Sequence, residues 1–92
     1  GTIMFTKCMA VEWAQRGIRV NGIAPGFMDT PLTQNRLSVS GDPVVKKWVE
    51  GTPMNRVGKP SELVGLALYL ASDAAAYTTG TVVSVDGGYT CL

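Results

Sequence analysis

Apolar residues at three- and four-residue spacing over residues 2–15 predict a helix. Phe5, Met9 and Trp13 recur at four-residue spacing, and Ile3 and the apolar neighbours of these residues belong to the same pattern. Gly17 follows the helix, where a left-handed residue commonly ends one. No capping residue precedes the apolar pattern, so we expect the helix to begin upstream of Gly1. The chain is then expected to be a fragment, the C-terminal part of a longer domain.

Two short apolar segments, residues 18–24 and 81–85, predict β-strands. The second is apolar enough to be covered on both faces. Pro25 follows the first strand and lacks an N–H, so we expect it to stop strand pairing. The triplet 86–88, Asp-Gly-Gly, fits a tight turn better than a metal or phosphate loop.

The region between the strands predicts two small helices and one longer one. Thr30-Pro31 and Asp42-Pro43 each join a capping residue to a proline at the first helical position. Residues 31–56, with the flexible linker 38–42, are typical of a lid over a pocket, and equally of a plain helical excursion packed on the core.

Residues 60–71 predict the clearest helix, with Pro60 at its start and Glu62 in its first turn. Its apolar residues surround most of the helix, so we expect burial on more than one side. The order helix, strand, small helices, helix, strand predicts an α/β fold with a parallel sheet. Two strands do not make such a sheet alone, which again predicts a missing N-terminal part.

Composition excludes several functional classes. The chain has 92 residues, at most one domain, and only 16% are charged, so we expect part of its surface to be covered. The net charge is +1 with scattered basic residues, which disfavours nucleic-acid binding. No apolar run reaches the length of a membrane span. Lone Cys8 and Cys91 fit a reducing, cytoplasmic setting, and a chain without His predicts no metal site.

Ligands of open parallel sheets bind beyond the carboxyl ends of the strands. Here that position is Pro25-Gly26, followed by Thr30. The missing Cβ of Gly26 could admit a flat ligand ring, and the Thr30 hydroxyl could cap a helix or bond to a ligand. An ordinary turn followed by a capped helix explains the same residues. Asn21 is polar within an apolar strand, so we expect a structural hydrogen bond to nearby backbone.

No catalytic residue is expected within the chain. The usual general base is absent because there is no His. None of Tyr69, Tyr77 and Tyr89 is followed four residues later by Lys, so no tyrosine–lysine proton-transfer pair can form.

Six short motifs occur in order, and together they make the chain closely resemble the C-terminal part of short-chain dehydrogenases/reductases. They are Arg19-Val20-Asn21, Pro25-Gly26 with Thr30, Gly58-Lys59-Pro60 with Glu62, Ala71-Ser72-Asp73, Thr79-Gly80 and Asp86-Gly87-Gly88. The resemblance implies a doubly wound Rossmann-type sheet. It also implies NAD or NADP as cofactor and hydride transfer between an alcohol and a carbonyl, with a small-molecule substrate.

The resemblance also assigns residue roles. Pro25, Gly26, Met28 and Thr30 match the segment that embraces the nicotinamide end of the cofactor, and residues 31–56 match the substrate-binding loop. The family's phosphate loop and its catalytic Ser, Tyr and Lys would lie upstream of Gly1, which implies that this fragment alone is inactive. Helix 60–71 and strand 81–85 match elements that pack between subunits, commonly in homotetramers.

The tail, residues 77–91, is similar to family members that act on sugars and polyols. Bacterial 3-oxoacyl carrier-protein reductases share most of the same motifs, so a parent of that kind is an alternative. A second alternative is a non-catalytic, truncated piece that docks on intact subunits, motivated by the low charge and the incomplete sheet.

Overall fold

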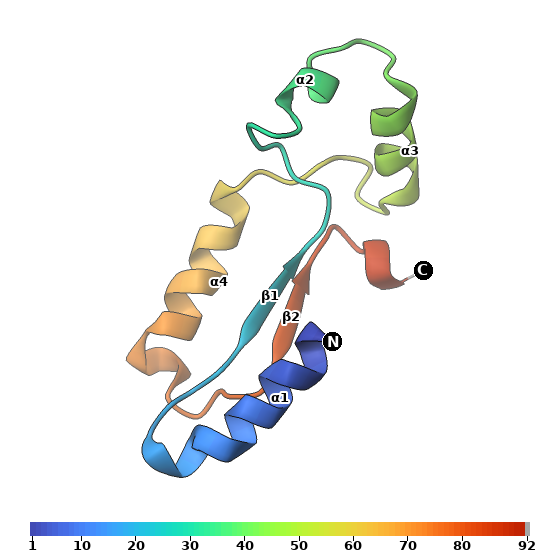
Figure 1. Cartoon of the computed structure of the whole chain (residues 1–92). Coiled ribbons are helices and arrows are strands. Elements are labelled where there is room, and N and C mark those ends of the chain that lie inside the picture. Colours follow the sequence, from blue (N-terminus) through green and yellow to red (C-terminus); the bar gives the residue numbers. More distant parts are fainter. Residues whose placement is uncertain (92) are drawn as a thin grey trace. The chain divides into compact units, whose positions relative to one another are not determined.

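The structure is a computed structural model that describes residues 1–91, and it divides into two compact units. The first unit comprises residues 1–24 and 65–83, and the second comprises residues 25–64 and the chain from residue 84 onward. The helices and strands are α1 (Thr2–Trp13), β1 (Gly22–Pro25), α2 (Gln34–Leu37), α3 (Pro43–Gly51), α4 (Ser61–Ala71) and β2 (Val82–Val85), with 3₁₀ turns at Ala14–Arg16, Asp73–Ala75 and Tyr89–Cys91 (Figure 1).

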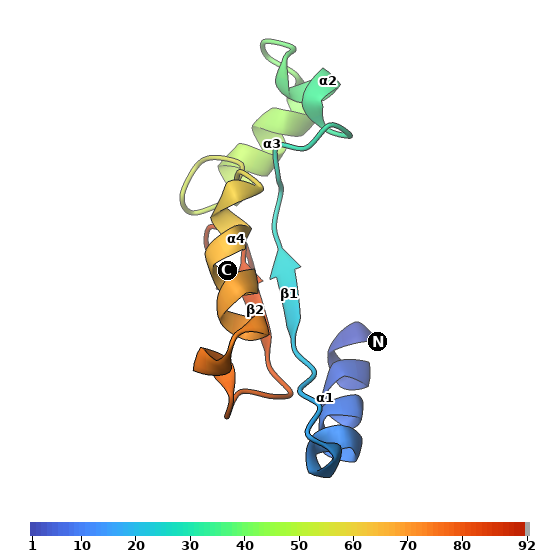
Figure 2. The same ribbon diagram turned by 90° about the vertical axis from the view of Figure 1, so that its left-hand side faces the viewer.

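Strands β1 and β2 pair in parallel. The Gly22 N–H donates to the Thr81 carbonyl at 2.9 Å, and the Gly26 N–H donates to the Val85 carbonyl at 3.0 Å. Both strands advance by the same number of residues between these bonds, which is the register of a parallel pair. Figures 1 and 2 show the two arrows side by side and pointing the same way. The predicted fold class, α/β with a parallel sheet, is confirmed.

Strand β1 begins later than the sequence predicted, at Gly22 rather than at residue 18. The backbone of Val20 bonds instead to the loop before β2: its N–H donates to the Thr79 hydroxyl, and its carbonyl accepts from the Gly80 N–H. The Asn21 side chain donates to the Thr78 carbonyl and accepts from the Thr81 N–H, which confirms its structural role. These contacts fix the entry to β1 without a regular ladder.

Pro25 does not stop strand pairing, so that expectation is wrong. It is the last residue of β1, and the next residue still donates to β2. Successive N–H groups of a strand point to opposite edges, and those of Gly22 and Gly26 face β2. The nitrogen of Pro25 therefore faces the other edge, where its missing N–H removes no bond to β2.

Helix α1 packs through small residues within the first unit. Thr6 and Ala10 are its buried residues, and a Cβ added at Gly80 would lie 3.4 Å from the Ala10 Cβ. The predicted end of the helix is confirmed: Gly17 has φ 75°, and its N–H donates to the Ala14 carbonyl at 3.1 Å. Close approach of helix and loop at this point depends on small side chains on both sides.

Burial of α4 and of β2 is less than predicted. None of the residues of α4 is buried among the described residues, and Leu68 is 65% exposed. In β2, Ser84 is exposed and the other residues are half-buried. Both elements have the predicted apolar pattern, but residues 1–91 cover it only in part.

Two N-terminal helix signals had different outcomes. At α3, the Asp42 carboxylate accepts the Val44 N–H at 2.8 Å and Pro43 is the first helical residue, as predicted. At Thr30-Pro31 the predicted helix start is wrong, because residues 31–33 form a turn and α2 begins only at Gln34. Two small helices between the strands are confirmed.

The predicted turn after β2 is also confirmed. Gly87 and Gly88 have φ 62° and 93°. The Asp86 carboxylate accepts the Gly88 N–H at 3.0 Å and the Thr90 hydroxyl at 2.7 Å. These bonds, the Thr90 hydroxyl above all, hold the pKa of Asp86 below its ordinary value.

Among residues 1–91 no helix has both the length and the apolar character needed to cross a bilayer. Cys8 and Cys91 are both free thiols on exposed residues.

Candidate functional site

The chain beyond β1 is held by a second, shorter parallel contact. Met28 forms a parallel bridge with Gly58. The Gly58 N–H donates to the Phe27 carbonyl and the Asp29 N–H donates to the Gly58 carbonyl, both at 2.8 Å. One edge of the backbone of residues 27–29 is therefore paired with Gly58, and this pairing sets the orientation of the segment.

Met28 presents its own N–H on the opposite edge from Gly58. Within residues 1–91 this N–H has no hydrogen-bond acceptor, whereas the Met28 carbonyl accepts the Thr33 hydroxyl at 2.7 Å. A backbone donor in a fixed orientation is one way in which proteins read a ligand carbonyl. At position 28 the backbone therefore offers an available hydrogen-bond donor.

Thr33 organises the turn that follows, and sequence reasoning missed it. Its hydroxyl accepts the Thr30 N–H at 2.9 Å and lies 3.3 Å from the Thr30 hydroxyl. Thr30 is thus placed by a hydroxyl three residues later, and it does not cap a helix. Each hydroxyl has one donor and two acceptor positions, so Thr30 keeps hydrogen-bonding capacity for a ligand.

All four residues predicted to bind a cofactor line one pocket of the second unit, with a cavity volume of about 400 Å³. That volume falls within the usual range of small-molecule sites. The lining residues are Pro25, Gly26, Phe27, Met28, Thr30, Thr33, Trp48, Pro60 and Leu63. The pocket therefore has apolar walls and two neighbouring hydroxyls.

Gly26 has a reason within the chain itself for lacking a side chain. A Cβ at this position would lie 2.8 Å from both Cα and Cβ of Asp86. Such an approach to backbone is too close for any real Cβ, so β1 and β2 can stay paired here only with glycine. The sequence argument assigned this absence to a ligand ring, but the crowding by Asp86 already requires it.

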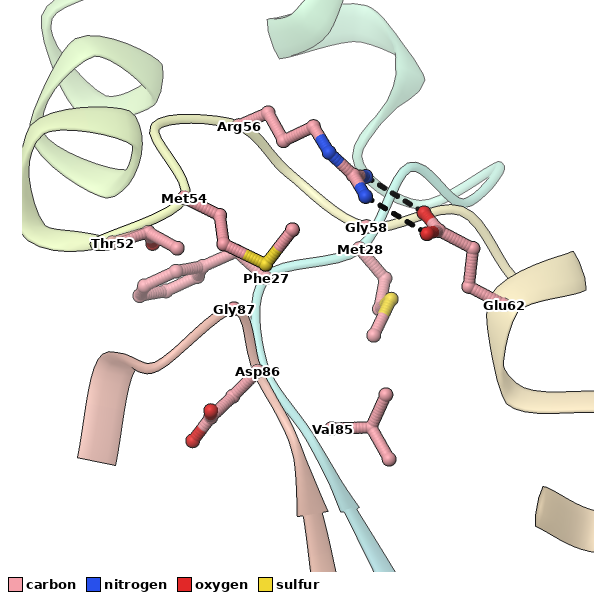
Figure 3. Close-up of a pocket in the computed structure, with 10 residues that line it drawn as sticks. All are labelled: Phe27, Met28, Thr52, Met54, Arg56, Gly58, Glu62, Val85, Asp86 and Gly87. Carbon is pink, nitrogen blue, oxygen red and sulfur yellow. Dashed lines mark hydrogen bonds and ion pairs between the residues drawn. The ribbon is translucent and has the colours of Figure 1, made fainter. Parts of the chain in front are cut away.

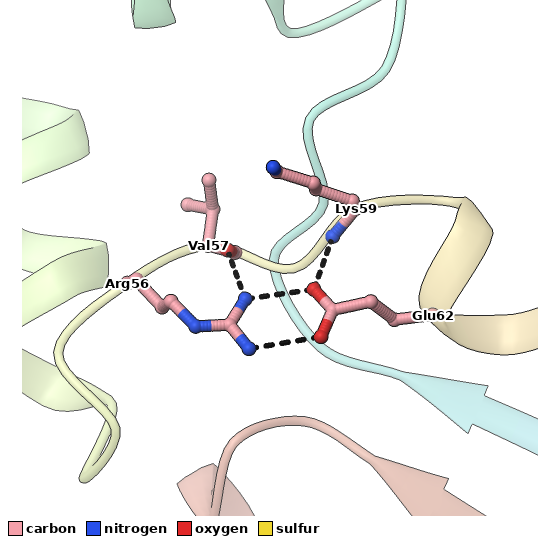
Figure 4. A network of polar contacts seen from close by, with 4 residues as sticks. All are labelled: Arg56, Val57, Lys59 and Glu62. Carbon is pink, nitrogen blue, oxygen red and sulfur yellow. Dashed lines mark hydrogen bonds and ion pairs between the residues drawn. The ribbon is translucent and has the colours of Figure 1, made fainter.

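Arg56 and Glu62 fasten the loop that carries Gly58 (Figure 4). Two Arg56 nitrogens donate to the two Glu62 oxygens at 2.7 and 2.8 Å, and the Lys59 N–H donates to the carboxylate at 3.0 Å. The bond to Arg56 is the main cause that lowers the pKa of Glu62 to about 2. The pair lies beside a small cavity of about 110 Å³, which Met28 and Met54 also line (Figure 3). The ion pair between Arg56 and Glu62 therefore holds the loop of Gly58, which forms the bridge with Met28.

Phe27 is the second residue that sequence reasoning missed. Its ring stacks on Trp48 with centroids 5.0 Å apart and planes at 10°, and it meets Tyr89 edge-on at 5.1 Å. The segment 25–30, helix α3 and the C-terminal turn thus meet at one aromatic cluster. No group of three or more His, Cys, Asp or Glu among residues 1–91 is placed to hold a metal ion.

The fold is that of an α/β protein, and it has a pocket beyond the carboxyl end of a parallel strand. A family model described as enoyl-(acyl carrier protein) reductase matches residues 1–90. The chain belongs to the short-chain dehydrogenase/reductase family, which confirms the resemblance and the Rossmann-type fold.

Two curated relatives show the range of the family. The chain is 49% identical over 86 residues to a galactitol 2-dehydrogenase (L-tagatose-forming) of Cereibacter sphaeroides, covering 92% of this chain and 33% of the relative. It is 47% identical over 88 residues to a 3-oxoacyl-[acyl-carrier-protein] reductase of Chlamydia trachomatis, covering 96% and 34%. The chain therefore spans about a third of the length of the curated relatives it matches.

Solved structures agree with this placement. A gluconate 5-dehydrogenase from Burkholderia cenocepacia, in complex with NADP and tartrate, matches with a TM-score of 0.86 and 36% identity over 99% of this chain and 35% of that one. A 4-hydroxyisoleucine dehydrogenase complexed with NADH matches with a TM-score of 0.89 and 34% identity over 99% and 37%. Neighbours of this chain thus bind either nicotinamide cofactor.

Proposed function

We propose that the whole protein is an NAD(P)-dependent oxidoreductase that interconverts an alcohol and a carbonyl, and that this chain holds the nicotinamide end of its cofactor. The observation that carries the proposal is the pocket lined by Pro25, Gly26, Met28 and Thr30. Family membership and the NADP- and NADH-bound neighbours support it. The comparisons do not favour a non-catalytic docking piece.

The residues of the pocket fit a nicotinamide. Pro25 and Leu63 provide apolar surface for a flat ring. A carboxamide has one acceptor oxygen and an NH₂ donor, which the free Met28 N–H and the Thr30 hydroxyl complement. Since glycine at position 26 lets β2 approach β1, the segment stays close to the strand end where ligands of parallel sheets bind.

The bound cofactor would supply the hydride acceptor or donor of the reaction. Oxidation of an alcohol removes a hydride from carbon and a proton from oxygen, and reduction reverses both. In this proposal residues 25–30 orient the nicotinamide, and residues outside the chain transfer the proton, because none of the three tyrosines here is followed four residues later by lysine.

For the substrate, we propose a sugar or polyol, with a 3-oxoacyl thioester as the alternative. The similarity to galactitol 2-dehydrogenase supports the first and the similarity to 3-oxoacyl-[acyl-carrier-protein] reductase supports the second. Helices α2 and α3, within residues 31–56, form the substrate loop of this proposal. NAD(P)-dependent rates with a panel of polyols, matched ketoses and a 3-oxoacyl thioester would choose between the two.

Replacement of Thr30 tests the cofactor role. In the whole protein that carries this chain, Thr30→Val keeps the shape of the side chain and removes its hydroxyl. Loss of one hydrogen bond of about 1.4 kcal/mol should raise the Kd for NADH or NADPH about ten-fold. Ser38→Ala removes an exposed hydroxyl that does not line the pocket, so it is the control and should leave the cofactor Kd unchanged. An unchanged cofactor Kd in Thr30→Val would contradict a role of the Thr30 hydroxyl in cofactor binding.

A further inference from the structure

A second, larger cavity of the second unit lies next to the proposed cofactor pocket. Its volume is about 610 Å³. Its lining residues are Phe27, Pro43, Val44, Lys47, Trp48, Gly51 and Tyr89. Phe27 and Trp48 line both cavities, so this pair of stacked rings is a wall that the two cavities share.

The walls of this cavity are mostly apolar and are held by contacts among their own residues. Phe27 is held by the stack on Trp48 and by the edge-on contact with Tyr89. The helix that carries Trp48 is capped by Asp42, and the Thr52 hydroxyl donates to the Trp48 carbonyl at 2.7 Å. Aromatic faces fixed in this way suit the C–H surface of a small carbon chain.

Lys47 gives the cavity a positive charge that no carboxylate of residues 1–91 neutralises. Three other basic side chains of this unit pair with acids: Arg36 with Asp42, Lys46 with Glu50, and Arg56 with Glu62. Among the described residues Lys47 has no carboxylate within 4.0 Å, and it is the lysine that lines the cavity. An apolar cavity with one uncompensated cation favours an organic anion over its neutral analogue.

We infer that this cavity binds the substrate of the proposed oxidoreductase, and that Lys47 favours a small hydroxy or oxo acid over the neutral sugars and polyols that similarity to known relatives suggests. The inference rests on the proposed function. The carboxylate pairs with the Lys47 ammonium, and the carbon chain lies along Trp48 and Tyr89. The shared ring wall then puts the reacting carbon next to the cofactor pocket. Lys47 is a specificity-determining residue in this account and takes no part in proton transfer.

Paired probes test the inference, one with a carboxylate and the other with a neutral group in its place. D-gluconate against D-glucitol represents a sugar acid, and 3-hydroxybutyrate against butan-2-ol represents a hydroxy fatty acid. Calorimetric titration of the whole protein that carries this chain should show binding of at least one anion about five- to ten-fold tighter than its neutral partner. The preference should fall as ionic strength rises, because salt screens an exposed ammonium.

Lysine variants test whether Lys47 causes the preference for the anionic probe. Lys47→Met should abolish it and Lys47→Arg should retain most of it. Lys46→Met, which removes the neighbouring lysine that pairs with Glu50, should leave it unchanged. A wild-type protein that prefers neither anion, or a Lys47→Met variant that keeps the preference, would overturn the inference. NADH and NADPH titrations test the proposed function separately, since their failure to bind would contradict the oxidoreductase and would not depend on Lys47.

Discussion

Glycine is required at position 26 by the close approach of Asp86, whether or not a ligand binds there. The sequence motif Pro25-Gly26 marks the end of β1, and both residues line the proposed cofactor pocket. It could not reveal the reason for the glycine, because Asp86 lies far along the chain and approaches only in the folded state. The same limit applies to Phe27, whose partners Trp48 and Tyr89 come from distant segments.

Alanine at position 26 should therefore destabilise the protein. The added Cβ meets the Cα and Cβ of Asp86 at 2.8 Å, and relief of that clash requires backbone movement. Overpacking of this kind costs about 1–3 kcal/mol of unfolding free energy. The matched control is Gly65→Ala in α4, where a Cβ meets no heavy atom of residues 1–91 within 4 Å. That change should stabilise the helix by about 0.5–1 kcal/mol. Urea unfolding of both variants checks the opposite signs.

Glu62 should contribute to the acid sensitivity of the protein. Its pKa is lowered from 4.5 to about 2, chiefly by the hydrogen bond from Arg56. A carboxyl group with a lowered pKa in the folded state stabilises that state above pH 4.5 and loses the contribution as the pH falls toward 2. Glu62→Gln should lose stability above pH 4.5 and show a shallower decline below it.

The size of the Glu62 effect should depend on salt, since the Arg56 and Glu62 side chains are 46% and 39% exposed. Glu50→Gln breaks a more exposed pair with a 3.9 Å separation, so it serves as the control and should leave the pH profile of unfolding unchanged. Identical pH profiles for Glu62→Gln and wild type would contradict the assigned role.

Among the elements, the two helix-start signals show what local sequence can and cannot predict. Asp42-Pro43 begins α3 as expected, because the Asp42 carboxylate reaches the Val44 N–H. Thr30-Pro31 is the same kind of signal, but there a turn forms instead. The Thr33 hydroxyl donates to the Met28 carbonyl and accepts from the Thr30 N–H. The Thr33 hydroxyl is close in sequence to Thr30. Its other partner, Met28, is held by the bridge to Gly58, which is distant in sequence.

Removal of the α3 cap should weaken the wall that carries Trp48. Asp42→Ala leaves the Val44 N–H without its acceptor and should cost about 1 kcal/mol of unfolding free energy. Asp42→Asn keeps a capping oxygen and should cost much less. Trp fluorescence during chemical unfolding can follow the change, and equal losses in the two variants would show that the cap does not stabilise α3.

On the scale of the whole molecule, the described chain has little core. Ala10 and Ala75 are its buried apolar residues, whereas apolar residues of α1 and α4 such as Phe5 and Leu68 are 65% exposed. The composition predicted a covered surface, and the exposed helix faces agree with that reasoning. We propose that further chain of the whole protein, and other copies of it in a homo-oligomer, cover these faces.

The 92-residue chain prepared alone should accordingly bind a dye such as ANS and associate on size-exclusion chromatography, because its apolar helix faces remain exposed. It should also bind NADH poorly and show no turnover. The whole protein should show neither ANS binding nor concentration-dependent aggregation. A well-folded monomer of the isolated chain, or hydride transfer by it, would contradict this expectation.

The methyl group of Met28 offers the most direct test of the nicotinamide site. In the whole protein with ¹³C-labelled methionine methyl groups, NADH or NADPH should shift the Met28 resonance at saturation. ADP-ribose, which has the adenosine end but no nicotinamide, should shift it much less. Met4 and Met9 lie in the other unit and serve as internal controls. A Met28 resonance that neither cofactor moves, or that ADP-ribose moves equally, would contradict the assignment of residues 25–30 to the nicotinamide end.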